Sequence, residues 1–275
     1  MKQRLDLTLV ELGLVDSRAK AQAVIMAGDV FVDGQRVDKA GAQVANTANI
    51  EVRSAMPYVS RGGLKLAHAL DAFNLRDRIP GAAALDIGAS TGGFTDVLLQ
   101  AGASHVFAVD VGTNQLAWKL RTDPRVTPME QTNIRDLTSL PPYDPEQQGA
   151  SSLADLATAD VSFIGLELIT PAALRLTTHN AFFVFLIKPQ FEAGRERVGK
   201  GGVVRDPRVH HDVIIRLADL WLGMGLYFAG LARSPITGPA GNIEYLAYLE
   251  KSVSDNTEPF DLKSAINREV FLHDK

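Results

Sequence analysis

Residues 84–111 combine side chains suited to binding a ligand that carries a ribose. A short apolar run ends at Asp86, a glycine-rich turn follows it, and a second apolar run ends at Asp110. Glycine lets a ligand approach the backbone closely, and the free amides at the start of a helix favour an anionic group. A carboxylate at the end of the second strand is placed to accept hydrogen bonds from both hydroxyls of a ribose. This stretch therefore predicts a nucleoside-binding turn.

The glycine spacing separates this turn from a dinucleotide site. The dinucleotide fingerprint needs G-x-G-x-x-G, whereas here Gly88 precedes Ala89 and Ser90 and the glycine pair comes later. The pattern Asp-x-Gly-x-x-x-Gly-Gly with a ribose-binding acid resembles the signature of class I methyltransferases, which implies S-adenosyl-L-methionine as the cofactor. A turn without any ligand is the alternative. The candidate cofactor-binding residues, including an acid that follows the third strand, are Asp86, Gly88, Ser90, Thr91, Gly92, Gly93, Phe94, Asp110 and Asp136.

Two lysines and two acids stand at the ends of predicted elements. Lys65 lies within an apolar helix just before the first strand, and Asp160 ends the fourth strand. Lys188 ends the most apolar strand of the chain, and Glu244 directly precedes the last one. Because ligands of a wound parallel sheet bind at the carboxyl ends of its strands, we expect these residues to face one crevice. The alternative for Lys65 is a surface lysine whose stem lies along apolar neighbours.

The elements that would position these residues alternate between strand and helix. Apolar runs predict strands at 83–87, 105–109, 126–127, 156–161 and 181–187, followed by two closing strands at 226–232 and 245–249. Helical spacing predicts helices at 64–73, 94–101, 114–120 and 209–222, and a terminal one around 262–271. This order predicts an α/β fold, a Rossmann-like sheet of the class I methyltransferase type with helices on both faces.

The first 54 residues predict a small α+β unit of their own. Helices are expected at 4–13 and, after Ser17 as N-cap, at 18–27. Asp33-Gly34 suits the tight turn of a hairpin, and a short strand is expected at 49–52. We expect this domain at 1–54, a linker at 55–59, the larger domain at 60–252 and a C-terminal tail at 253–275.

Several motifs in order make the chain similar to a known family. SRGGLKL, DIGASTGGF, ADVSF and LIKPQFE resemble successive motifs of FtsJ-type ribose 2′-O-methyltransferases. The first 50 or so residues resemble the RNA-binding domain of ribosomal protein S-four. The pairing resembles the TlyA family, also labelled haemolysin A, over residues 1 to about 250. The turn departs from the Ala-Pro-Gly-Gly of FtsJ itself by having Ser90-Thr91, with the glycines kept.

The resemblance implies methyl transfer to a ribose 2′-hydroxyl of ribosomal RNA, in this family at a cytidine. It also implies that Lys65, Asp160, Lys188 and Glu244 form a Lys-Asp-Lys-Glu catalytic tetrad. Lys188 could take the hydroxyl proton in its neutral form, or stabilise the developing alkoxide as a cation. Asp160 would position Lys188, while the other pair orients the hydroxyl.

A formal net charge of −4 counts against RNA as a partner unless basic residues gather locally. Two such regions are expected, one in the small domain and one in a mobile, glycine-rich flap at 191–211. In residues 1–53 acids match basic residues in number, so RNA binding there depends on their separation onto different faces. Ordinary solvated charges are the alternative in the small domain, and a disordered connection with incidental charge is the alternative at 191–211. The RNA-binding candidates are Arg4, Ser17, Arg18, Lys20, Arg61, Arg195, Arg197 and Lys200.

Composition excludes several other classes. The chain has no cysteine, which rules out disulfides and thiolate metal sites and agrees with a cytoplasmic location. No apolar stretch approaches the roughly 20 residues that span a bilayer, and charges interrupt residues 1–25, where a secretory signal would lie. We expect neither a metal nor a membrane partner. The alternative functions are a catalytically silent RNA-binding or ribosome-assembly factor and a membrane-lytic haemolysin. The oligomeric state, the nucleotide and the ribosomal subunit stay open.

Overall fold

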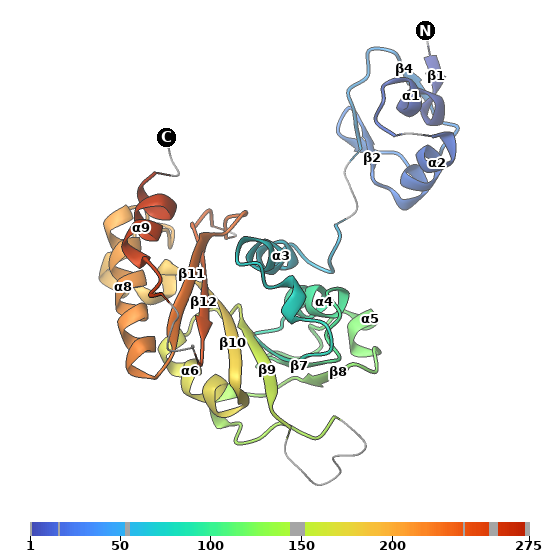
Figure 1. Cartoon of the computed structure of the whole chain (residues 1–275). Helices are drawn as coiled ribbons and strands as arrows, with labels where there is room; N and C mark the ends of the chain where they lie inside the picture. The colour runs from blue at the N-terminus through green and yellow to red at the C-terminus, as the bar shows by residue number, and fades with distance from the viewer. Residues whose placement is uncertain are drawn as a thin grey trace. The chain divides into compact units, whose positions relative to one another are not determined.

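The structure is a computed structural model that describes residues 2–15, 17–52, 56–143, 152–238, 240–252 and 258–272. Residues 54 and 55 of the expected domain boundary and linker lie outside the described residues, as do 253–257 and 273–275 of the expected tail. The chain divides into two compact units, Met1–Pro57 and Tyr58–Lys275. Figure 1 colours the first unit blue and the second from teal to red.

The first unit packs two helices, α1 (Leu5–Glu11) and α2 (Arg18–Ala27), against short strands. The Ser17 side chain accepts a hydrogen bond from the backbone amide of Lys20 and so caps α2, as expected for a helix N-cap. A three-stranded sheet has the order β3-β2-β5. Its strands are β2 (Val30–Val32), β3 (Gln35–Arg36) and β5 (Ile50–Val52). A second, two-stranded sheet that the sequence pattern did not predict joins β1 (Lys2–Arg4) to β4 (Gln43–Ala45).

A seven-stranded, mostly parallel sheet organises the second unit, in the order β11-β12-β10-β9-β6-β7-β8. Six strands run in the same direction, and β12 lies antiparallel between β10 and β11. The chain moves outward from the central β6 to β8 and then crosses back to β9, so the strand order reverses between β6 and β9. The strands are β6 (Ala83–Ile87), β7 (His105–Val109), β8 (Val126–Met129), β9 (Ala154–Ala159), β10 (Thr177–Ile187), β11 (Tyr227–Arg233) and β12 (Tyr245–Glu250).

Helices cover both faces of this sheet, which confirms the predicted fold class (Figure 1). One face buries apolar residues of α3 (Gly62–Ala72), α4 (Gly93–Gln100) and α5 (Trp118–Arg121). The other buries those of α6 (Leu166–Arg175), α8 (Pro207–Gly223) and α9 (Leu262–Ile266). Shorter helical segments are η1 (Arg76–Arg78), η2 (Ile134–Asp136), α7 (Pro189–Glu192), η4 (Arg195–Arg197) and η5 (Asn267–Phe271). The sequence pattern did not predict α6, which contains Pro171.

Strand register brings the expected functional residues to one edge of the sheet. Ile87 and Ala159 are partners in adjacent parallel strands, so the residues that follow them, Gly88 and Asp160, lie side by side. Ile187 pairs with Tyr245 across the antiparallel β10–β12 ladder. Because β12 runs the opposite way, Lys188 at the end of β10 and Glu244 before β12 meet at the same edge. The topology thus gathers residues that lie up to 156 positions apart in the chain, from 88 to 244.

Candidate active site

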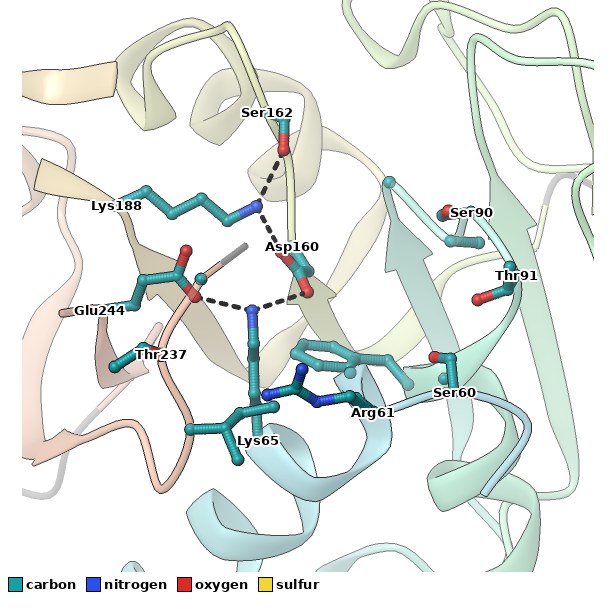
Figure 2. Close-up of a pocket in the computed structure, with 17 residues that line it drawn as sticks. Ser60, Arg61, Lys65, Ser90, Thr91, Asp160, Ser162, Lys188, Thr237 and Glu244 are labelled. Carbon is teal, nitrogen blue, oxygen red and sulfur yellow. Dashed lines mark hydrogen bonds and ion pairs between the residues drawn. The ribbon is translucent and has the colours of Figure 1, made fainter. Parts of the chain in front are cut away.

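The two lysines and two acids expected to converge form one alternating chain of charges. Lys188 Nζ lies 2.6 Å from Asp160 Oδ1, and Lys65 Nζ lies 3.6 Å from Asp160 Oδ2. Lys65 Nζ also lies 2.6 Å from Glu244 Oε2, which ends the chain. Figure 2 shows both lysines reaching the same carboxylate, Lys188 from just after β10 and Lys65 from α3. Two cations and two anions leave the cluster without net charge.

Burial makes this pairing energetically necessary. Lys65 and Lys188 are 7% and 8% exposed, and Glu244 is 1% exposed. A buried charge without a partner is costly, so each of these groups needs the ion pair that it makes. An ammonium has three donors, and Lys188 directs one to Asp160 and another to Ser162 Oγ at 2.9 Å. The third donor is left for a group in the cavity that Lys188 lines.

Two cavities of about 370 Å³ each meet at the ends of β6 and β9. Volumes of this order are typical of small-molecule sites. The first is lined by the whole tetrad, the start of α3, the glycine turn and the loop before β12. The second lies beside it, along the ends of β7 and η2. Both are lined by Gly88, Ser90, Asp160 and Ser162, so a group held in one cavity would lie next to a group in the other.

The glycines of the turn are required by close packing within the protein. Gly88 has φ +80°, and a Cβ there would lie 2.9 Å from the backbone oxygen of Asp160. Gly92 has φ +93° and lines neither cavity, and a Cβ there would lie 2.3 Å from the Leu120 side chain. Packing thus requires this glycine, and its assignment to the cofactor stays a prediction. A Cβ at Gly93 would meet Ser60, although Gly93 does line the first cavity together with Thr91 and Phe94.

Asp86 lines neither cavity, and its assignment to the cofactor site stays a prediction. Its side chain is fully buried and accepts hydrogen bonds from Thr95 Oγ1 at 2.6 Å and Thr158 Oγ1 at 3.0 Å. Burial raises the pKa of Asp86 to about 6, and the nearby charge of Asp160 acts in the same direction. Asp86 therefore ties β6 to α4 and β9 beneath the turn.

Asp110 directly follows β7 and lines the second cavity. Its carboxylate accepts the backbone amides of Gly112 at 2.7 Å and Ser90 at 2.8 Å, which leaves further lone pairs for ribose hydroxyls. Asp136 does not line this cavity, because η2 turns it toward a separate hollow. Asn133, three residues earlier, occupies the wall where the acid was expected.

Phe163 is the residue that sequence reasoning missed. It lines the second cavity, is 90% exposed, and has φ +64°, a backbone conformation that is strained for a bulky side chain. Its ring lies 4.8 Å from that of Phe191, centroid to centroid. Strain of this kind gathers at functional sites. The available signal was an aromatic residue directly after Asp-Val-Ser at a strand end.

Comparisons with known proteins decide the family. The FtsJ-like methyltransferase family matches residues 58–251, and the S4 domain matches residues 3–47. The chain belongs to the FtsJ-like methyltransferase family. It is 42% identical over 271 residues to the 16S/23S rRNA (cytidine-2′-O)-methyltransferase TlyA of Mycobacterium tuberculosis, covering 98% of this chain and 97% of that protein.

Two further relatives of this FtsJ-like methyltransferase carry different names. The chain is 48% identical over 251 residues to YqxC of Bacillus subtilis, named as an rRNA methyltransferase, covering 90% of this chain and 85% of that protein. A solved structure from Streptococcus thermophilus, titled a hemolysin, superposes with a TM-score of 0.70 at 43% identity, covering 98% of this chain and 94% of that one. Among the described residues of this FtsJ-like methyltransferase, no helix has the length and apolarity that crossing a bilayer requires.

In the S4 domain of this FtsJ-like methyltransferase, a buried acid gathers the expected RNA-binding arginines. Asp6 is fully buried and accepts hydrogen bonds from Arg4, at 3.0 Å to each oxygen, and from Arg18 at 3.0 Å. The pKa of Asp6 lies far below its usual range, chiefly because the Arg4 guanidinium donates hydrogen bonds to it. Both arginines stay partly exposed, and Lys20 is exposed two residues further along α2. The acid thus helps to hold basic groups together.

The basic segment at 191–211, predicted as a mobile flap, makes hydrogen bonds to the loop before β12 and within itself. The Asn242 side chain donates to the Gly202 carbonyl at 2.9 Å and accepts from the Val204 amide at 3.1 Å. The buried His210 ring contacts the Val204 carbonyl at 3.0 Å. Arg61 lines the first cavity, Arg195 and Lys200 are exposed, and Arg197 pairs with Asp212 at 2.6 Å.

The described residues contain no group of three or more candidate metal ligands.

Proposed function

We propose that this chain transfers a methyl group from S-adenosyl-L-methionine to a ribose 2′-hydroxyl of ribosomal RNA, at a cytidine. The observation that carries the proposal is the alternating Lys188–Asp160–Lys65–Glu244 chain at the junction of two cavities. The name of the Mycobacterium tuberculosis relative supports the choice of ribosomal RNA and cytidine.

The second cavity fits the cofactor by the chemistry of its lining. Asp110 would accept hydrogen bonds from the ribose hydroxyls, and the apolar side chains of Val111 and Ile134 would contact the adenine. Ser90 and Gly88, shared by the two cavities, would flank the part of the ligand that points toward the tetrad. When bound, the cofactor supplies a methyl group on a positively charged sulfur.

The first cavity provides what a ribose hydroxyl needs in order to react. This hydroxyl is a weak acid, so it attacks efficiently only when a neighbouring group takes its proton or stabilises the oxyanion. Lys188 has one donor position open toward the cavity, and Asp160 and Ser162 hold its Nζ in place. Lys65, fixed between two carboxylates, would orient the same oxygen. We infer that most of the rate enhancement comes from positioning the hydroxyl beside Lys188 and Lys65.

RNA would be held at three places. The exposed ring of Phe163 offers a stacking surface for a nucleobase beside the cavity. Arg61, at the wall of the first cavity, would contact a phosphate next to the target ribose. The Arg4 and Arg18 cluster of the S4 domain, with Lys20 nearby, would bind the backbone elsewhere on the same RNA.

The experiment uses purified full-length protein, tritiated cofactor and ribosomal subunits from cells that lack the gene. We expect label in ribosomal RNA, resistant to alkaline cleavage at one or more cytidines, because a 2′-O-methyl group blocks that cleavage. Asp110→Ala should lose cofactor affinity in calorimetry. Lys263→Ala, an exposed lysine of α9, serves as the control and should retain full activity. Binding of ribosomal RNA without any transfer would favour the silent assembly factor instead.

A further inference from the structure

Gln190 joins the two halves of the tetrad from one short segment. It follows Lys188 by two residues and lies in α7, with Pro189 between them. Its Nε2 donates to Glu244 Oε1 at 3.3 Å, while Lys65 Nζ lies 2.6 Å from Oε2 of the same carboxylate. Among the described residues these are the two donors to the Glu244 carboxylate. The segment that carries Lys188 therefore also reaches the far end of the charge chain.

The other end of the Gln190 amide indicates why this residue is present. Its Oε1 is buried and has no hydrogen-bond partner in the described part of the chain. A buried carbonyl without a partner destabilises the folded state, so a side chain that only filled space here would be better apolar. The amide is turned so that its donor meets Glu244, and the orphaned oxygen is the consequence of that orientation.

We propose that Gln190 is a positioning residue for the tetrad. It holds Glu244 in one orientation as an acceptor, and through Glu244 it fixes Lys65 beside Asp160. A bond of 3.3 Å is long for a charge-assisted contact, and such bonds tighten when substrate closes the site. The inference rests on the proposed function, because the effect of Gln190 is measured on the rate of methyl transfer. Gln190 lines neither cavity, so its influence on the reaction passes through Glu244.

The first test replaces Gln190 by methionine, which has a similar volume and no donor. We expect kcat to fall about tenfold, the lower end of what loss of a supporting hydrogen bond costs at an active site. KM for RNA and the Kd of the cofactor should stay within a factor of about two, because neither cavity is altered. Gln100→Met is the matched control, since Gln100 also donates to a buried carboxylate, Asp96 at 3.1 Å, outside both cavities.

The second test uses Gln190→Glu and a pH series, which a merely structural role would not affect. In acid, one of the two facing carboxyls carries a proton and donates to the other, as the glutamine does. At higher pH both ionise and repel, and the charged groups around them are Lys65, Asp160 and Lys188. The ratio of variant to wild-type kcat should therefore fall by about tenfold from about pH 5 to about pH 9.

The outcomes separate this inference from the proposed function. If wild type transfers no methyl group to any ribosomal RNA, the proposed function fails, and a crystal structure of Gln190→Met still decides the role of Gln190. In that structure the Glu244 carboxylate should turn, and Lys65 Nζ should follow it away from Asp160. Unchanged geometry at Glu244 would overturn the inference. So would a wild-type kcat in Gln190→Met, or a ratio for Gln190→Glu that is constant with pH.

Discussion

Replacing each tetrad lysine by methionine should separate chemistry from stability. Methionine keeps most of the side-chain volume and removes the amine. In Lys188→Met, Asp160 keeps Lys65 at 3.6 Å and its own partial exposure of 20%, so no buried charge is left alone. Lys188 does not line the second cavity, so cofactor binding should survive. In Lys65→Met, Glu244 loses its only cation within the described residues while it is 1% exposed.

The expected magnitudes differ accordingly. Loss of a positioned proton acceptor or oxyanion partner lowers kcat by about 10²- to 10⁴-fold, or about 3–5 kcal/mol of transition-state stabilisation, and we expect this for Lys188→Met. The same variant loses about 2 kcal/mol of unfolding free energy, the value of a hydrogen bond to a charged group. Lys65→Met should lose about 3–5 kcal/mol, because it leaves a buried carboxylate without its cation.

Single-turnover transfer of a tritiated methyl group at saturating cofactor measures the chemistry. Calorimetry measures cofactor affinity, and chemical denaturation measures the unfolding free energy. The reasoning is refuted if Lys188→Met transfers methyl groups at more than a tenth of the wild-type rate. It is equally refuted if Lys65→Met unfolds no more easily than Lys188→Met, since Glu244 would then not depend on its ion pair.

Three further changes test other parts of the structure. The raised pKa of Asp86, about 6 in the folded state against 3.8 otherwise, means that its contribution to stability is fully present below about pH 4 and lost as pH rises through 6. The free energy of unfolding of Asp86→Asn, measured by denaturation at each pH, should therefore rise relative to that of wild type by up to about 3 kcal/mol between those limits. A difference that is constant with pH would contradict the assignment. Phe163→Gly should lower kcat/KM for RNA about tenfold through lost stacking, with no loss of thermal stability, because a strained exposed residue is removed. Asp6→Asn should weaken RNA affinity about threefold in filter binding, because Arg4 and Arg18 lose the carboxylate that holds them in place. This loss is expected although the change removes a negative charge. Tighter binding would show that Asp6 only repels RNA.

Residues at strand ends were predictable because local signals mark them. Apolar runs predict β6 and β7 at the positions where they are found. Lys188 and Glu244 are predictable because each adjoins an apolar strand, β10 or β12. In a parallel sheet the strand ends necessarily meet, so their convergence follows from topology once the strands are placed. Lys65 was harder, since an isolated lysine in an apolar helix is more often a surface residue.

Other features depend on contacts between residues far apart in the chain, which no local pattern contains. Asp86 stands at a strand end, but its hydrogen bonds to Thr95 and Thr158 are visible only once α4 and β9 are in place. Gly92 matches a ligand-binding pattern, yet its neighbour is Leu120. The exposure and strain of Phe163 arise from the backbone turn after β9, which residue types alone do not specify.

The most direct test of the central claim is a map of ribose 2′-O-methylation on ribosomal RNA from cells that lack the gene. The strain is complemented in parallel with the wild-type protein and with Lys188→Met at equal expression. The account predicts one or more modified cytidines that return with wild type and stay absent with the variant. An identical map in all three strains, or full modification by Lys188→Met, would contradict it.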